Sequence, residues 1–269
     1  MDSPVTVNDS LPSLLQDGEA PAFQLFNGDG HSPILILCDH ASNRIPECLG
    51  DMGLNDEDFE KHIAYDIGGE DVARNLAERL DCAALIAGYS RLIIDLNRHP
   101  GDGSSIPEIS DEIEIPANHQ LTPEQIIRRE NTFFWPYHNA VTEQLNHIVA
   151  RGDEPIIISV HSFTPSYRGY QRPWHIGVLW DQDQRLSQPL LESLRQEPGL
   201  CVGDNEPYHA RHPLGFTMDV HCERNGYPHV LLEIRQDLIN DKEKANHWAG
   251  LIERHLQDAF TQTGLLTET

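Results

Sequence analysis

Basic residues are scarce in this sequence. Of its 269 residues, 19 are Lys or Arg and 43 are Asp or Glu, so the formal net charge is −24. Nucleic-acid binding and docking on an anionic membrane both need basic surface, and neither is expected. Long apolar runs are missing too, since none approaches the roughly 20 residues of a membrane-spanning helix. The N-terminus, MDSPVTVNDSLPSLLQDGEA, lacks the basic start and apolar centre of a signal peptide.

Cysteine is present but forms no recognisable pattern. The five cysteines are an odd number at irregular spacings, without a CxxC pair: Cys38, Cys48, Cys82, Cys201 and Cys222. A disulfide framework shows even numbers and regular spacings, so we expect reduced thiols in a cytoplasmic protein. Several enzyme motifs are missing as well, because the chain has no HExxH, no P-loop and no GxGxxG after a strand.

What the chain does contain is an alternation of apolar strands and amphipathic helices. Residues 1–30 are acidic and show no period, so we expect an irregular N-terminal arm, followed by a single domain over 31–269. Apolar runs predict strands at 33–40, 83–87, 91–96, 155–161, 175–181 and 227–236. Helical patterns lie between these strands, at 67–80, from Thr122 onward and at 184–196, and a last one follows them at 241–262.

The apolar runs also indicate the fold class. Several strands are apolar on both faces, which is typical of a mostly parallel sheet covered by helices. We therefore predict an α/β fold, with one three-layer domain in which helices flank a mostly parallel central sheet. The long helix should begin with Thr122 as N-cap and Pro123 at its first position, and Pro136 should kink or break it.

One strand raises a particular question. PIIISVHSF, residues 155–163, is a buried apolar run that ends at His161. The imidazole can be a polar stop at the strand end, or the strand can hold it over a site. The other strand ends favour the second interpretation, because ligands of such sheets bind beyond the carboxyl ends of the strands. Those ends bring together His40, Asn97, Arg98, His161, Glu233 and Arg235.

Six short segments resemble the N-formylglutamate amidohydrolase family. In chain order they are DHASNRIP (39–46), HIAYDIGGEDVA (62–73), SRLIIDLNR (90–98), SVHSF (159–163), DNEPYHARHPLGFTMDVH (204–221) and LLEIRQDL (231–238). Six motifs in this order make the resemblance specific, and it covers roughly residues 32–260. The family is similar in fold to the zinc-dependent exopeptidases, so the resemblance implies a zinc-exopeptidase-like domain.

The zinc carboxypeptidases offer a weaker resemblance that implies residue roles. His161 would bind zinc, Asn97 and Arg98 would grip a substrate carboxylate, and Glu233 would be the catalytic carboxylate. The sequence departs from the carboxypeptidase HxxE pattern, because Asn43 stands three residues after His40. A carboxylate ligand must then come from elsewhere. Asp66, just before the helix at 67–80, is the candidate, and the carbonyl oxygen of Asn43 is the alternative.

These residue types fit metal-assisted amide hydrolysis. Two imidazoles and one carboxylate form a three-ligand zinc site with an open position for water. Glu233 would act as general base. Arg98 or Arg235 would hold a substrate carboxylate through paired hydrogen bonds. Tyr208 and His221 lie in matching motifs and are further candidates for substrate contact.

Each assignment has a structural alternative. His40 can be a polar cap at a strand end, and Asp66 can complement a helix dipole. Glu233 can form a structural salt bridge with a nearby arginine, and Arg98 can be a partner in such a salt bridge. The function we expect is hydrolysis of an N-acyl amino acid such as N-formylglutamate, with a divalent metal, most simply Zn²⁺. The alternatives are a carboxypeptidase-like or aminoacylase-like zinc hydrolase, or a non-catalytic binder of an acidic metabolite. The oligomeric state is left open.

Overall fold

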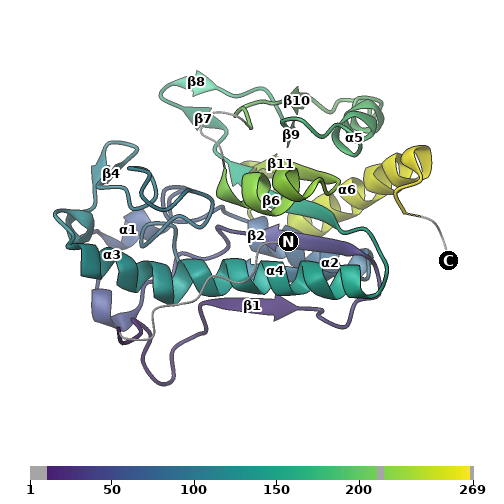
Figure 1. Ribbon diagram of the computed structural model, residues 1–269. Coiled ribbons are helices and arrows are strands. Elements are labelled where there is room, and N and C mark those ends of the chain that lie inside the picture. Colours follow the sequence, from purple (N-terminus) through teal and green to yellow (C-terminus); the bar gives the residue numbers. More distant parts are fainter. Residues whose placement is uncertain (1–10, 211–214, 267–269) are drawn as a thin grey trace.

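The computed structural model describes residues 11–210 and 215–266, and its centre is a seven-stranded sheet (Figure 1). The strand order is β1-β3-β2-β6-β11-β9-β10. The bounds of these strands are Phe23–Phe26 (β1), Ile34–Cys38 (β2), Ala83–Ala87 (β3), Ile156–Phe163 (β6), Ile176–Leu179 (β9), Val202–Asp204 (β10) and His229–Arg235 (β11).

The sheet is mixed but mostly parallel, as the apolar runs predict. Strands β3, β2, β6 and β11 are parallel neighbours, and β10 is parallel to β9. Strands β1 and β9 run antiparallel to their neighbours β3 and β11. Every residue of β2, β3, β6 and β9 is buried, because helices or loops cover both faces of these strands.

Helices cover both faces of the sheet and complete the predicted three layers. Figure 1 shows α4 running across the front, while α2 lies behind it and packs against β2, β3 and α6. The helix bounds are Asp56–Phe59 (α1), Gly69–Arg79 (α2), Pro123–Arg129 (α3), Trp135–Ala150 (α4), Ser187–Leu194 (α5) and Lys242–Thr263 (α6). In the described part of the chain, no helix is both long enough and apolar enough to cross a membrane.

The long helix that begins after Thr122 changes its winding at the predicted proline. The Thr122 side chain accepts a hydrogen bond from the Gln125 amide, 3.3 Å away, and caps α3. The chain then passes through a π-helical turn, Glu130–Phe134, before α4 begins. Pro136 has no N–H to donate to the preceding turn, so the regular ladder cannot continue through it.

The predicted strand at 91–96 is wrong. Residues 92–96 are buried and Arg91 is half-buried, but the segment forms turns and irregular backbone instead of joining the sheet. Side chains replace a neighbouring strand as hydrogen-bond partners: Asn118 Nδ2 donates to the Leu92 carbonyl at 2.9 Å, and Arg129 Nη1 donates to the Ile93 carbonyl at 2.8 Å. Burial without a strand partner is possible here because the backbone groups are satisfied in this way.

The expected irregular arm over residues 1–30 needs a correction at Phe23–Phe26, which form edge strand β1. Phe23 pairs with Ala87 of β3, and its ring packs edge-on against the ring of Tyr137, with 6.3 Å between the ring centres. The four-residue strand is only half-buried, so its sequence lacks a clear alternating pattern. Residues 1–10 lie outside the described part of the chain.

Two small hairpins project beyond the sheet. One consists of β4 (Ile109–Ser110) and β5 (Ile113–Glu114), and the other of β7 (Ser166–Tyr167) and β8 (Tyr170–Gln171). The first hairpin follows the mostly buried segment 91–98, and the second follows the carboxyl end of β6. They therefore stand near the edge at which the sequence predicts a site.

Candidate active site

A cavity of about 450 Å³ opens over the face of β6, β11 and β9. Strand β11 contributes every second residue to its wall, namely His229, Leu231 and Glu233, because alternate side chains of a strand share one face. Hairpin β4–β5 and strand β7 supply further wall residues, including Ile109 and Tyr167. The volume lies within the range of small-molecule sites.

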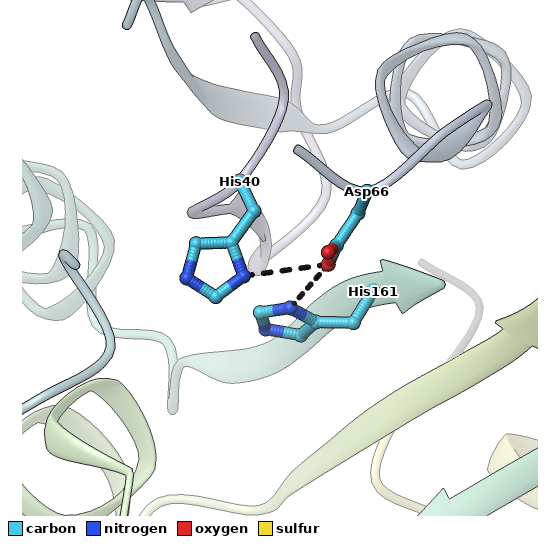
Figure 2. Close-up of side chains that lie close together, drawn as sticks. All are labelled: His40, Asp66 and His161. Atoms are coloured by element: carbon cyan, nitrogen blue, oxygen red, sulfur yellow. Dashed lines mark hydrogen bonds and ion pairs between the residues drawn. The ribbon is translucent and has the colours of Figure 1, made fainter. Parts of the chain in front are cut away.

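Three side chains of metal-ligand type meet in this cavity (Figure 2). His40 follows β2, Asp66 precedes α2, and His161 lies on β6. Oδ2 of Asp66 is 2.8 Å from Nδ1 of His161 and 3.4 Å from Nδ1 of His40. All three residues are buried, and one ligand atom from each lies within 4.8 Å of the others. We call these three residues the His-Asp-His cluster.

Further carboxylates orient the two imidazoles. Asp95 Oδ1 lies 2.7 Å from Nε2 of His40, and Asp39 Oδ2 lies 3.6 Å from Nε2 of His161. Each carboxylate is therefore on the opposite side of the ring from Asp66. Once Nδ1 has lost its proton, a hydrogen retained on Nε2 leaves the Nδ1 lone pair for a metal ion, and such outer carboxylates commonly accompany metal-binding histidines.

The carboxylates also determine the protonation of the cluster. Burial alone would lower the pKa of His161, but the interactions with the carboxylates of Asp39 and Asp66 outweigh burial and raise that pKa to about 10. Burial would raise the pKa of Asp39, yet the ion pair with His161 holds it at about 2. The pKa of Asp66 is likewise low, because His40 and His161 outweigh its burial. Both acids are ionised at neutral pH, the state in which carboxylates bind metals.

The donor set suits a divalent cation. Two imidazole nitrogens and one carboxylate oxygen are the ligands of several catalytic zinc sites, in which the fourth position is open to water. The predicted ligands His40 and His161 lie with Asp66 in a group that could hold a metal ion. The Asn43 amide donates to the Phe59 carbonyl, 3.0 Å away.

Glu233 stands next to the cluster. It lies directly opposite His161 in the parallel pairing of β11 with β6, so both side chains are on the cavity face. Glu233 is 8% exposed, and its Oε2 atom has no hydrogen-bond partner among the described residues. Burial is the largest cause of a rise in its pKa to about 7. A carboxylate with that pKa can both accept and release a proton near neutrality.

Three more polar residues come from the irregular segment 91–98. Asn97 is buried at the cavity wall, where its Oδ1 atom accepts from the Thr217 amide at 3.2 Å. Arg91 binds Asp95, with 2.5 Å between Nη2 and Oδ2. Arg98 also lines the cavity, and Nη1 donates to the carbonyl of Asn97, 2.8 Å away. No carboxylate of a described residue lies within ion-pair distance of Arg98.

The other predicted substrate-contacting residues divide into two groups. Tyr208 lines the cavity. Arg235 and His221 do not: the Arg235 guanidinium binds Asp237 through contacts of 2.8 and 3.2 Å. His221 Nε2 lies 3.0 Å from Nδ1 of His138 in a buried imidazole pair behind the cavity wall.

Sequence reasoning assigned no role to several residues that support the site. Tyr137 Oη and Thr217 Oγ1 donate to the two oxygens of Asp39 at 2.7 and 2.8 Å. Asp39 directly precedes His40 in the segment DHASNRIP (39–46), so its position in the sequence indicates that it lies near the site. Tyr137 and Thr217 are far from Asp39 in the chain, and nothing in their local sequence indicates that contact.

The chain is similar in sequence and fold to known proteins. The model of the N-formylglutamate amidohydrolase family matches residues 32–240. Gene product Atu2144 from Agrobacterium tumefaciens has a solved structure with 31% identity and a TM-score of 0.90, covering 93% of this chain and 98% of that one.

A second solved structure is less similar. N-formylglutamate amidohydrolase from Ralstonia eutropha JMP134 has 20% identity and a TM-score of 0.62, with 91% of this chain and 98% of that chain covered. This likeness concerns the fold alone. No curated protein matches the chain at a significant level. Since the family model spans most of the sequence and the motifs that it covers form the cavity, the chain belongs to the N-formylglutamate amidohydrolase family.

Proposed function

We propose that the protein is a metal-dependent amidohydrolase that cleaves the amide bond of an N-acyl amino acid such as N-formylglutamate. One observation carries the proposal. The free Oε2 atom of Glu233, a carboxyl group with a pKa of about 7, stands beside the His-Asp-His cluster inside a single cavity.

Each residue of the site has a part in this reaction. His40, Asp66 and His161 would hold the divalent ion, for which we propose zinc. When bound, such an ion lowers the pKa of a water molecule and polarises the amide carbonyl. Glu233 would take a proton from the attacking water and deliver it to the leaving amine. Asp95 and Asp39 would keep both imidazoles in the tautomer that binds metal.

The charges in the cavity support a substrate that bears a carboxylate. A chain with a net charge of −24 repels anions at long range, so a local cation must reverse the field where an anionic substrate binds. Arg98 meets this need, because it lines the cavity and no described carboxylate lies within ion-pair distance of it. The formyl group and the glutamate are proposed from the family to which the chain belongs.

A second candidate function also has support. Beyond Glu233, the cavity wall includes Leu179, Trp180 and Leu231, which form an apolar surface. That surface suits an acyl group longer than formyl, as in an aminoacylase-like hydrolase. Five unpaired cysteines support the expected cytoplasmic compartment, since thiols stay reduced there.

A substrate screen tests the proposal. Zinc-loaded protein is incubated with N-formyl, N-acetyl and longer N-acyl derivatives of glutamate, aspartate, leucine and lysine, and release of the free amine is measured. We expect hydrolysis of N-formyl-L-glutamate, with Glu233→Gln as the inactive control. Preference for long acyl groups would favour the aminoacylase-like candidate. Metal-loaded protein that hydrolyses none of these amides would contradict the proposal and favour a non-catalytic binder.

A further inference from the structure

Arg172 is a buried cation in an unusual environment. Its side chain is 7% exposed, and its guanidinium carbon lies 5.6, 5.0 and 4.9 Å from the ring centres of Phe163, Tyr167 and Tyr208. All three rings line the cavity. The guanidinium therefore lies directly behind the aromatic part of the cavity wall.

No carboxylate of a described residue lies within ion-pair distance of Arg172, although the chain contains 43 acidic residues. Its Nη1 atom donates instead to the carbonyl and hydroxyl oxygens of Thr164, at 3.3 and 3.1 Å, and to Tyr208 Oη at 3.2 Å. Burying a guanidinium costs hydration energy, which the three rings and neutral acceptors offset only in part. Packing alone would be served better by an uncharged side chain of similar length.

The contact with Tyr208 determines the direction of a hydrogen bond. Arginine can only donate, so Tyr208 Oη must be the acceptor, and the phenol hydrogen remains free for another partner. Burial is the main cause that raises the pKa of Tyr208 to about 12, and the hydroxyl therefore keeps this hydrogen at neutral pH. Tyr208 as a whole residue is 40% exposed and lines the cavity, and its hydroxyl lies against the buried Arg172.

The backbone that carries Tyr208 is also held firmly. A Cβ atom on Gly177 or Gly203 would lie only 2.0 or 2.6 Å from the carbonyl oxygen of Glu206, so this segment rests on the bare backbone of β9 and β10. The Asn205 side chain accepts from the amide of Ala210 at 3.3 Å and closes the loop around Tyr208. The backbone contacts hold the loop that carries the Tyr208 ring, and Arg172 holds the Tyr208 hydroxyl.

We propose that Arg172 is a positioning residue for substrate recognition, which holds the Tyr208 hydroxyl so that its hydrogen is donated to an anionic oxygen of the bound substrate. The inference rests on the proposed function for the identity of that substrate. It adds a second point of anion recognition to Arg98. Because Tyr208 would contact the substrate before the reaction begins, the effect belongs to binding.

Kinetics of paired variants test this role with zinc-loaded protein and N-formyl-L-glutamate. Arg172→Met keeps the packing against the rings but removes every donor, and KM should rise roughly tenfold while kcat stays within about twofold. Arg172→Lys restores a charge and a donor, and most of the loss should be recovered. Arg74→Met is the matched control, because Arg74 also stacks on a ring, Phe26 at 4.8 Å, outside the cavity.

A double-mutant cycle shows whether Arg172 acts through Tyr208. Tyr208→Phe should raise KM as much as Arg172→Met does, and the double variant should be no worse than Tyr208→Phe alone. Additive losses would overturn the inference. So would an unchanged KM in Arg172→Met, or equal losses in the Met and Lys variants accompanied by a lower melting temperature.

Calorimetric binding of glutarate separates this inference from the proposed function. If wild-type protein hydrolyses no N-acyl amino acid but binds glutarate, the proposed function fails, while the role of Arg172 and Tyr208 in anion binding can still be tested. Arg172→Met and Tyr208→Phe should then weaken glutarate binding to the same extent. Equal affinity in all variants would overturn the role of Arg172. Wild-type protein that binds neither glutarate nor N-formyl-L-glutamate would overturn both.

Discussion

Asp95 Oδ1 lies 2.7 Å from Nε2 of His40, opposite the Nδ1 atom that faces Asp66. The same carboxylate binds Arg91 through its other oxygen. Asp95 thus fixes the ring orientation of His40, a proposed metal ligand, and connects it to a cation at the cavity wall. Its own pKa is held low, since the charges of Arg91 and His40 outweigh the effect of burial.

Asp95→Asn should weaken metal binding without abolishing it. The amide keeps an acceptor for His40 but removes the negative charge that makes the imidazole a better ligand, so affinity should fall roughly 10- to 100-fold. Competition with a zinc-sensitive chelator dye measures the affinity. Asp102→Asn, at an exposed position in the following loop, is the control. Equal zinc affinity in wild type and Asp95→Asn would show that Asp95 only binds Arg91.

The His-Asp-His cluster should bind one divalent ion per chain. His161→Ala removes a central ligand and should release that ion, because the two remaining ligands cannot complete the site. Native mass spectrometry or elemental analysis gives the metal content. His138→Gln is a suitable control, since His138 is also a buried histidine but lies outside the cluster. Full metal content in His161→Ala would refute the assignment.

Glu233 should matter for turnover more than for metal content. Glu233→Gln keeps the shape of the side chain and removes the basic oxygen, so kcat should fall by about 100-fold or more. Metal analysis of the same sample verifies that the cluster is still loaded. Near wild-type turnover with metal bound would mean that Glu233 has a structural role.

Arg98 should recognise a carboxylate of the substrate. Arg98→Lys keeps the charge but loses the planar pair of donors, so kcat/KM should fall by roughly 10- to 100-fold, or about 1 to 3 kcal/mol. Replacing the substrate carboxylate by an amide should cost the wild type a similar factor and cost Arg98→Lys much less. If both enzymes lose equally, another cation recognises the carboxylate, and Arg91 is the next to test.

The buried imidazole pair should make the fold sensitive to mild acid. Burial lowers the pKa of His138 to about 4 and that of His221 to about 3, from ordinary values near 6.5. Because the folded pKa values are depressed, the unfolded chain binds protons first as the pH falls below about 6.5, and stability contributed by the neutral pair is lost toward pH 4. Above that window the contribution is fully present.

Urea unfolding of wild type and His221→Gln at pH 7 and pH 5 isolates this effect. Glutamine can still donate to Nδ1 of His138, but it does not titrate. On going from pH 7 to pH 5, the wild type should lose about 2 kcal/mol of unfolding free energy more than the variant. Other groups, including Glu233 and His161, titrate in both proteins, so the difference between the two is diagnostic. Identical losses would show that His221 is protonated in the fold.

The regular elements and the two histidines of the His-Asp-His cluster could be predicted because their signals are local. Apolar runs such as Ile156–Val160 indicated buried strands, and the polar residue after each run indicated the edge of the sheet. His40 and His161 lie close together because β2 and β6 are parallel neighbours, so both strands end at the same edge of the sheet. Asp66 is expected at the site from the resemblance to related enzymes, because its position before α2 is only a weak signal, and the structure brings it beside both histidines.

The remainder depended on contacts between distant parts of the chain. The segment 91–96 has the composition of a strand, but Asn118 and Arg129 satisfy its backbone from more than 20 residues away. Arg235 is predicted at the site because it follows Glu233 at the end of its strand, yet Asp237 binds its guanidinium. Arg172 carries no local signal at all, because three rings from separate segments create its environment.

The tight contact between Gly177 and Glu206 has a consequence for how members of this family can diverge. A methyl group at position 177 would meet a main-chain carbonyl at 2.0 Å, and a main-chain atom can move only if its whole segment moves. The wall bearing Tyr208 would then shift without any change in a charged or hydrogen-bonding group. Substitution of either glycine is therefore expected to move the cavity wall that bears Tyr208, and at Gly177, which pairs with Glu233 across β9 and β11, the change also reaches the strand position of that glutamate.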